Sequence, residues 1–221
     1  MAMQPRWGLV AFDMDGVLVD YTSSWTWVHD HFKIDNEETL LAYIQGRIDD
    51  REFMRQDIRR WMDVKADICR RDLETILDPV PIIDGISQTV AALRTAGAKV
   101  VIVSGGLDMT AGRIAREHGF DDYLANSVEC DLDGILTGEG VLRVDLTNKG
   151  AALRQFQERY GVDETRTVSI GNSFVDVSMF ALSGLSIAFN PIDDHVKKNA
   201  DVVVNARDLR DVLPHILGQP R

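Results

Sequence analysis

This 221-residue chain lacks basic clusters, closely spaced cysteines and long apolar runs. Its 24 Lys and Arg residues are outnumbered by 35 Asp and Glu residues, which gives a net charge of −11. Nucleic acid and anionic membrane surfaces are therefore not expected as partners, because both bind basic patches. No segment approaches the roughly 18 consecutive apolar residues that a membrane-spanning helix needs.

The two cysteines, Cys69 and Cys130, are too far apart in sequence to form a metal-binding motif. So few cysteines favour a reducing compartment, and residues 1–7 have no apolar core of the kind found in a signal peptide. We therefore expect a soluble, cytoplasmic protein. The apolar fraction of 45% is enough to build a sizeable core.

Short β-type runs alternate with helical patterns along most of the chain. This alternation predicts an α/β fold with a doubly wound parallel sheet covered by helices. A turn signal at Asp133-Gly134 predicts a hairpin within residues 127–145. The expected strands are residues 9–12, 99–103, 167–170, 185–188 and 201–204, and the expected helices are residues 86–96, 108–118, 149–160 and 174–182.

Residues 22–78 interrupt this alternation, because they contain helical patterns and no convincing strand. A crossover between parallel strands needs only about a dozen residues, so the segment predicts a separate helical cap after the first strand. We expect a Rossmann-like core domain of residues 1–20 and 80–221 and a small cap domain of residues 21–79. A cap in this position would cover the carboxyl end of the first strand.

Two carboxylates, Asp13 and Asp15, follow directly after the apolar run of residues 9–12. Open α/β sheets bind their ligands at the carboxyl ends of the strands. Paired carboxylates with no Lys or Arg nearby in sequence are costly unless they share a cation or a proton. The pattern indicates a metal site, or a pair in which Asp13 attacks an electrophile such as phosphorus and Asp15 transfers protons.

Ser104-Gly105-Gly106 and Lys149 follow the same logic at later strand ends. The glycines allow backbone N–H groups to approach an anion closely, although strand-Ser-Gly-Gly is also a common turn. Lys149 opens a predicted helix, against the helix dipole. A lone lysine is usually at the surface, but beside a phosphate it would neutralise charge on the transferring group.

Asn172 and Asp176 follow the expected strand at residues 167–170. Their oxygens, together with those of Asp13, would suit Mg²⁺, which binds few carboxylates and keeps several waters. Because the ends of parallel strands converge on one crevice, we expect all four motifs to meet there.

In this order, the four motifs resemble those of the haloacid dehalogenase superfamily, and within it the phosphoserine phosphatase-like branch. Residues 104–106, 127–145 and 185–190 are also similar to that branch. The resemblance implies that Asp13 forms an aspartyl-phosphate and that Asp15 is the general acid and base. It further implies a phosphate site of Ser104, Gly105 and Lys149 and a Mg²⁺ site of Asp13, Asp15, Asn172 and Asp176.

The chain departs from the family pattern at two positions. Asn172 replaces the usual first acid of the last motif, which removes one negative charge and predicts weaker metal affinity. Thr22 stands where phosphoserine phosphatases have a glutamate that meets the substrate's ammonium group. Arg60, after Phe53, matches the family's carboxylate-binding arginine, so Thr22, Phe53 and Arg60 are the candidate substrate-binding residues.

The sequence of the cap is compatible with more than one class of substrate. A carboxylate-bearing substrate without an amine, or one that is no amino acid, fits the pattern as well as phosphoserine does. Arg60 could equally lie on a solvated helix face, and Trp25 and Trp27 could form the core of the cap or line its pocket. His29 and His31 are expected on the cap surface.

The sequence therefore predicts a Mg²⁺-dependent phosphatase that hydrolyses a small phosphomonoester through an aspartyl-phosphate, as a monomer or homodimer. A phosphomutase or phosphotransferase on the same scaffold is one alternative, and a non-catalytic phospho-ligand-binding relative weakened at Asn172 is another. A dehalogenase is disfavoured because it would not need Asp15. A signalling receiver domain is disfavoured because it needs no lid.

Overall fold

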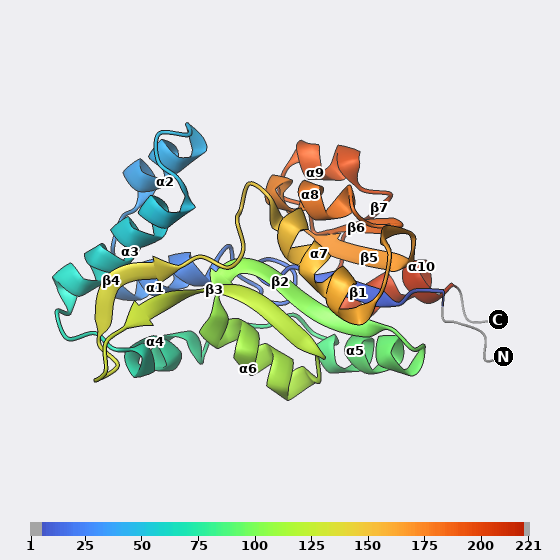
Figure 1. Cartoon of the computed structure of the whole chain (residues 1–221), viewed down its shortest axis with the longest axis horizontal. Helices are drawn as coiled ribbons and strands as arrows, with labels where there is room; N and C mark the ends of the chain where they lie inside the picture. Colours follow the sequence, from blue (N-terminus) through green and yellow to red (C-terminus); the bar gives the residue numbers. More distant parts are fainter. Residues whose placement is uncertain (1–5, 219–221) are drawn as a thin grey trace.

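The computed structural model describes residues 6–218 and shows, within them, a seven-stranded sheet flanked by helices (Figure 1). The strand order is β4-β3-β2-β1-β5-β6-β7, and every neighbouring pair is parallel except β3 and β4. This confirms the predicted α/β class. The strands are β1 (Leu9–Phe12), β2 (Lys99–Leu107), β3 (Asp122–Cys130), β4 (Leu136–Val141), β5 (Thr167–Gly171), β6 (Leu185–Phe189) and β7 (Val202–Val204).

Ten α-helices accompany these strands in the described residues. Four lie between β1 and β2, namely α1 (Ser24–Phe32), α2 (Glu37–Ile44), α3 (Asp50–Val64) and α4 (Arg70–Leu77). The others are α5 (Ile86–Thr95), α6 (Asp108–His118), α7 (Lys149–Tyr160), α8 (Val177–Phe180), α9 (Asp194–Asn199) and α10 (Leu213–Leu217).

The central strand β1 is buried on both faces, so its sequence is apolar at every position. Val10 and Phe12 pack in a core formed with α5, α6 and α10, whereas Leu9 and Ala11 pack in a second core with α7. Figure 1 shows α5 and α6 on the opposite side of the strands from α7. The two layers of helices cover both faces of the sheet and leave the carboxyl end of β1 uncovered.

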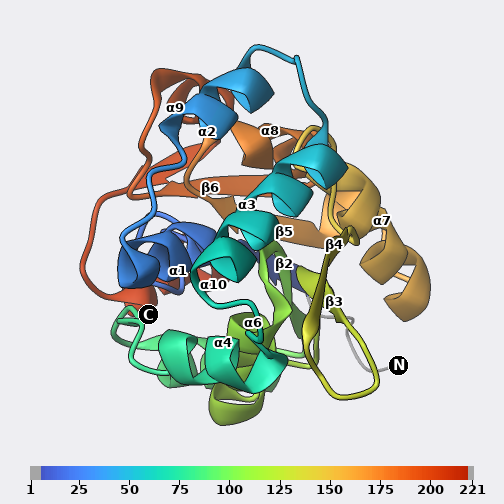
Figure 2. The same ribbon diagram turned by 90° about the vertical axis from the view of Figure 1, so that its left-hand side faces the viewer.

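The helices α1 to α4 form a group beyond the carboxyl ends of the central strands (Figure 2). Their apolar core includes Val28, Ile58 and Trp61, which are fully buried. Val128 and Leu136 of the β3–β4 hairpin pack in the same cluster. The segment of α1 to α4, here called the helical insertion, therefore packs on the hairpin. The two together form one wall of the space beyond the carboxyl end of β1.

Two predicted elements differ from the structure. Asp122–Cys130 forms the strand β3, whose first half pairs in parallel with β2 before its second half joins the predicted hairpin. Residues 174–182 form no single helix, because a 3₁₀ turn at Phe174–Asp176 precedes the short α8. In the part of the chain that the structure describes, no helix is long and apolar enough to cross a membrane.

Candidate active site

A cavity of about 250 Å³ lies between the carboxyl ends of the central strands and the helical insertion. β1 lies between β2 and β5, and the chain builds β2 to β4 on one side of it before it crosses to β5 on the other side. This is the switch point where doubly wound sheets bind ligands. Of the sequence-predicted site residues, the cavity is lined by Asp13, Asp15, Thr22, Phe53, Ser104, Gly105, Lys149 and Asn172.

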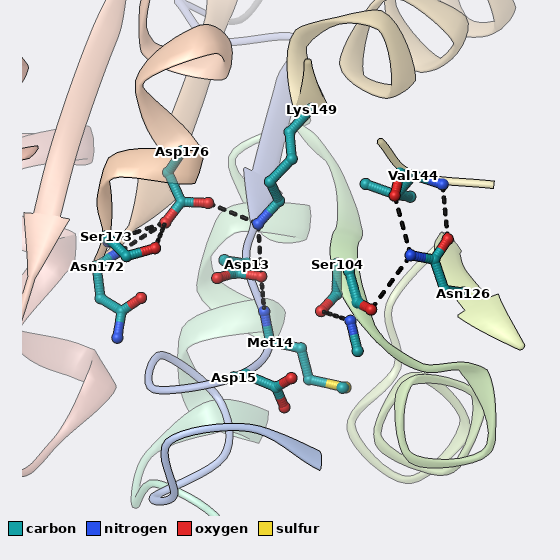
Figure 3. Close-up of polar contacts among 12 residues, drawn as sticks. Asp13, Met14, Asp15, Ser104, Asn126, Val144, Lys149, Asn172, Ser173 and Asp176 are labelled. Atoms are coloured by element: carbon teal, nitrogen blue, oxygen red, sulfur yellow. Dashed lines mark hydrogen bonds and ion pairs between the residues drawn. The ribbon is translucent and has the colours of Figure 1, made fainter. Parts of the chain in front are cut away.

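Asp13 follows β1 and lies at the base of this cavity with 4% of its surface exposed. Its backbone N–H donates to Ile170 O at 2.8 Å, which fixes the end of β1 against β5. Oδ1 accepts hydrogen bonds from Met14 N at 2.7 Å and Lys149 Nζ at 2.8 Å (Figure 3). These contacts both involve Oδ1, and no described residue donates a hydrogen bond to Oδ2. Burial raises the pKa of Asp13.

Lys149 begins α7 and is 1% exposed. Its Nζ lies 2.8 Å from Asp13 Oδ1 and 2.6 Å from Asp176 Oδ1 (Figure 3). Burial alone would lower the pKa of Lys149, but the two carboxylates raise it above its usual value. The lysine is thus a fixed buried cation, which offsets the free-energy cost of burying the Asp13 and Asp176 carboxylates close together.

Asp176 does not line the cavity, and both of its oxygens bond to the protein. Oδ1 accepts a hydrogen bond from Lys149 Nζ, and Oδ2 accepts hydrogen bonds from the backbone N–H groups of Asn172 at 2.9 Å and Ser173 at 3.1 Å. The carboxylate closes the turn after β5 and orients Lys149 at the same time. This geometry makes Asp176 a positioning residue.

Asp15 also lines the cavity, two residues beyond Asp13. Its Oδ2 accepts from Ser24 Oγ at 3.1 Å, whereas Oδ1 is buried without a hydrogen-bond partner among the described residues. A Cβ on Gly106 would lie 2.4 Å from Asp15 Oδ2, so only glycine leaves room for this side chain. Burial raises the pKa of Asp15 to about 6, a value suited to proton transfer near neutrality.

The end of β2 forms the opposite wall. Ser104 Oγ accepts from Gly106 N at 3.0 Å, which bends the chain around the hydroxyl. Gly105 O accepts from Trp25 Nε1 at 3.1 Å and from Asn126 Nδ2 at 3.2 Å. Asn126 also accepts from the N–H groups of Arg143 and Val144, both at 2.8 Å. It therefore joins three segments around the Ser-Gly-Gly turn.

A metal ion would need oxygens that the protein leaves unpaired. Asp13 Oδ2 and the Asn172 side chain line the cavity and make no hydrogen bond to a described residue. Gly16 has φ +76°, and a Cβ there would lie 2.0 Å from Asn172 Nδ2, so the amide packs closely over the loop after Asp15. The described residues contain no metal-type group of three Asp, Glu, His or Cys side chains. One carboxylate and one amide oxygen still suit Mg²⁺, because it keeps several waters.

Comparison with known proteins places the chain in a family. The model of the haloacid dehalogenase-like hydrolases matches residues 10–181. The chain belongs to this family. The phosphoserine phosphatase of Methanocaldococcus jannaschii is 29% identical over 97% of this chain and 100% of its own length. That of Idiomarina loihiensis is 30% identical over 93% and 92%, respectively.

Solved structures of phosphoserine phosphatases in this family have the same architecture. A phospho-aspartyl intermediate analogue superposes with a TM-score of 0.80 at 27% identity, covering 95% of this chain and 99% of the other. A substrate-bound complex superposes with a TM-score of 0.78 at 27% identity and covers 95% and 98%. These similarities confirm the predicted family, branch and enzyme class, a phosphoric monoester hydrolase.

Two expectations for residues 21–79 differ from the structure. Arg60 does not line the cavity, and its guanidinium instead donates to Asp35 O at 2.7 Å. His29 was expected on the surface but is 1% exposed, because Trp61 Nε1 donates to its Nδ1 and Asp57 lies against its Nε2. His31 is exposed, as expected.

Three further residues of the site escaped the sequence analysis. Ser24, Asn126 and Asp57 are each almost fully buried and reach the active site or its supporting loops. The spacing of Asp57 four residues after Phe53 places both on one face of α3, which was the available signal for Asp57. Ser24 and Asn126 carry no such signal, because their partners are distant in sequence.

Proposed function

We propose that this chain is a Mg²⁺-dependent phosphatase that hydrolyses a small phosphomonoester through an aspartyl-phosphate on Asp13. The observation that carries the proposal is the hydrogen bonding of the two carboxylate oxygens of Asp13. One of its oxygens is held by Lys149 and Met14 N, and the other faces the cavity without a hydrogen bond. A related solved structure is described as a phospho-aspartyl intermediate analogue, which supports the same covalent route here.

In the first step, the free oxygen of Asp13 forms a bond to phosphorus while the bond to the ester oxygen breaks. Asp15 gives its proton to the departing alkoxide. In the second step, water attacks phosphorus, Asp15 takes the water proton, and the bond between Asp13 and phosphorus breaks. Asp15 is back in its starting state, and inorganic phosphate leaves.

The phosphate oxygens would lie between the Ser104 hydroxyl, the N–H groups near Gly105 and the ammonium of Lys149. Phosphoryl transfer depends mainly on positioning and charge stabilisation, which fixed donors provide without reorganisation. Lys149 satisfies this requirement because Asp176 holds it from the other side at 2.6 Å.

Asp13, the Asp15 carbonyl and Asn172 would hold Mg²⁺. When bound, the ion neutralises charge on the phosphoryl group and orients it for attack. We further propose that residues 21–79 act as the cap domain of this enzyme and residues 1–20 and 80–221 as its core. A cap that closes over the cavity would exclude water other than the attacking molecule.

Substituting Asn172→Asp is expected to lower the Mg²⁺ concentration that gives half-maximal rate by roughly tenfold, about 1.4 kcal/mol of metal binding. The added carboxylate restores a negative charge beside the ion. Titrating phosphate release with Mg²⁺ measures the effect. Asn205→Asp is the matched control, because Asn205 is exposed and does not line the cavity. An unchanged titration in Asn172→Asp would show that this side chain is not a ligand.

The proposed function is tested by phosphate release from a panel of phosphomonoesters with millimolar Mg²⁺, with and without a chelator. The panel contains p-nitrophenyl phosphate, phosphoserine, phosphoglycolate, phosphoethanolamine and sugar phosphates. We expect turnover that the chelator abolishes. Transfer of phosphate to an added alcohol in place of release would favour a phosphotransferase, and silence from a folded protein would favour a non-catalytic binding relative.

A further inference from the structure

One face of helix α3 forms the wall of the cavity opposite the phosphate site. Asp50, Phe53, Met54 and Asp57 line the cavity at positions i, i+3, i+4 and i+7 of this helix. Among the described lining residues, Lys149 is the one cation, and it is committed to Asp13 and Asp176. The insertion therefore offers the substrate carboxylates and no positive charge.

Asp57 is the more deeply buried of these two carboxylates, with 1% of its surface exposed. Among the described residues it makes one polar contact, from Oδ1 to His29 Nε2 at 3.2 Å. Trp61 Nε1 donates to His29 Nδ1 at 3.2 Å, so the Trp61 indole occupies Nδ1 and the Nε2 edge of the ring faces Asp57. Among the described residues, no lysine or arginine side chain pairs with the buried Asp57 carboxylate.

An uncompensated buried carboxylate is costly, and the cost disappears when a ligand supplies the missing cation. Aromatic side chains line the same cavity as Asp57. Trp25 and Phe53 both line the cavity, and each is held by a stacked partner, Trp61 at 5.3 Å and Tyr43 at 4.8 Å between ring centroids. Fixed aromatic rings next to a carboxylate are the surroundings that bind ammonium groups.

We propose that the substrate is a phosphomonoester of an amino alcohol, whose ammonium group binds Asp57 while its phosphate binds at Asp13. This inference rests on the proposed phosphatase function and names its substrate class. A substrate carboxylate is disfavoured, because it would face Asp50 and Asp57 while the Arg60 guanidinium bonds to Asp35 O. Phosphoserine, which has both groups, should therefore be a poorer substrate than phosphoethanolamine.

The test compares kcat/KM for phosphoethanolamine with that for n-propyl phosphate, in which a methyl group replaces the ammonium. A charge-assisted contact predicts a preference for phosphoethanolamine of about 10- to 100-fold. Asp57→Asn should reduce this ratio to near one. Asp63→Asn is the matched control, because it removes the same charge from an exposed position of the same helix and should leave the ratio unchanged.

Equal kcat/KM values for the two esters in the unsubstituted enzyme would overturn the proposal, and so would an unchanged ratio in folded Asp57→Asn. Failure of the phosphatase function has a different signature, since neither ester nor p-nitrophenyl phosphate would then be hydrolysed. In that case the affinity of the Asp13→Asn variant for each ester, measured by titration calorimetry, tests the ammonium site. Tighter binding of phosphoethanolamine than of n-propyl phosphate would support the ammonium site, and equal binding would overturn it.

Discussion

Substituting Asp13→Asn is expected to lower the rate of phosphate release by on the order of 10³-fold or more. The amide cannot act as the nucleophile, so the covalent route is lost at its first step. The fold should survive, because Lys149 keeps its 2.6 Å contact with Asp176 and one buried negative charge is removed. Steady-state phosphate release and a urea unfolding curve measure the two effects.

Asp20→Asn is the control for Asp13→Asn, because it removes the same charge from an exposed position close in sequence. It should retain full activity. If Asp13→Asn released phosphate at a rate close to that of the unsubstituted enzyme, Asp13 would not be the nucleophile and the mechanism would be wrong. If it failed to fold, the argument that Lys149 and Asp176 support each other would be wrong.

Lys149→Met should destabilise the protein by about 3–5 kcal/mol, because it leaves two buried carboxylates without their shared cation. Asp13 and Asp176 lie 2.8 and 2.6 Å from Nζ, and Lys149 is 1% exposed, so the ammonium is the buried cation that both carboxylates share. Activity should fall together with stability, since the same ammonium is proposed to bind the phosphate. Urea unfolding with a chelator present measures the free energy of unfolding.

Lys99→Met provides the comparison for this substitution. Lys99 pairs with Asp121 at 2.8 Å, but its side chain is 49% exposed, so its loss should cost less than about 1 kcal/mol. Adding Asp176→Asn to Lys149→Met should recover part of the lost stability, because it removes one of the two unpaired charges. Equal small losses in Lys149→Met and Lys99→Met would contradict the account of the buried triad.

The polar residues at the strand ends could be predicted because they lie where topology brings them together. Asp13 and Asn172 each follow a parallel strand and Ser104 lies near the end of another, and the switch point at β1 places these ends around one cavity. Lys149 is predicted from the resemblance of the four motifs to the family, since a lysine that opens a helix is by itself most often at the surface. The signals of Asp13, Ser104 and Asn172 are local in sequence, and their meeting follows from the parallel sheet.

The pairing of His29 with Asp57 could not be predicted, because it depends on how α1 packs on α3 inside the insertion. Arg60 follows the family spacing after Phe53, yet the direction of its side chain is set by Asp35 O in the loop before α2. Asn126 interrupts an apolar pattern, so β3 was not expected there. Its side chain satisfies backbone groups that only the folded chain brings close.

The covalent intermediate is the central claim, and it can be observed directly. The enzyme is mixed with a phosphomonoester substrate and Mg²⁺, quenched in acid during turnover, digested and measured by mass spectrometry. We predict that the peptide containing Asp13 gains the mass of one phosphoryl group and that Asp13→Asn does not. Rapid substrate turnover with no phosphoryl group on that peptide, or with the group on another residue, would contradict the mechanism.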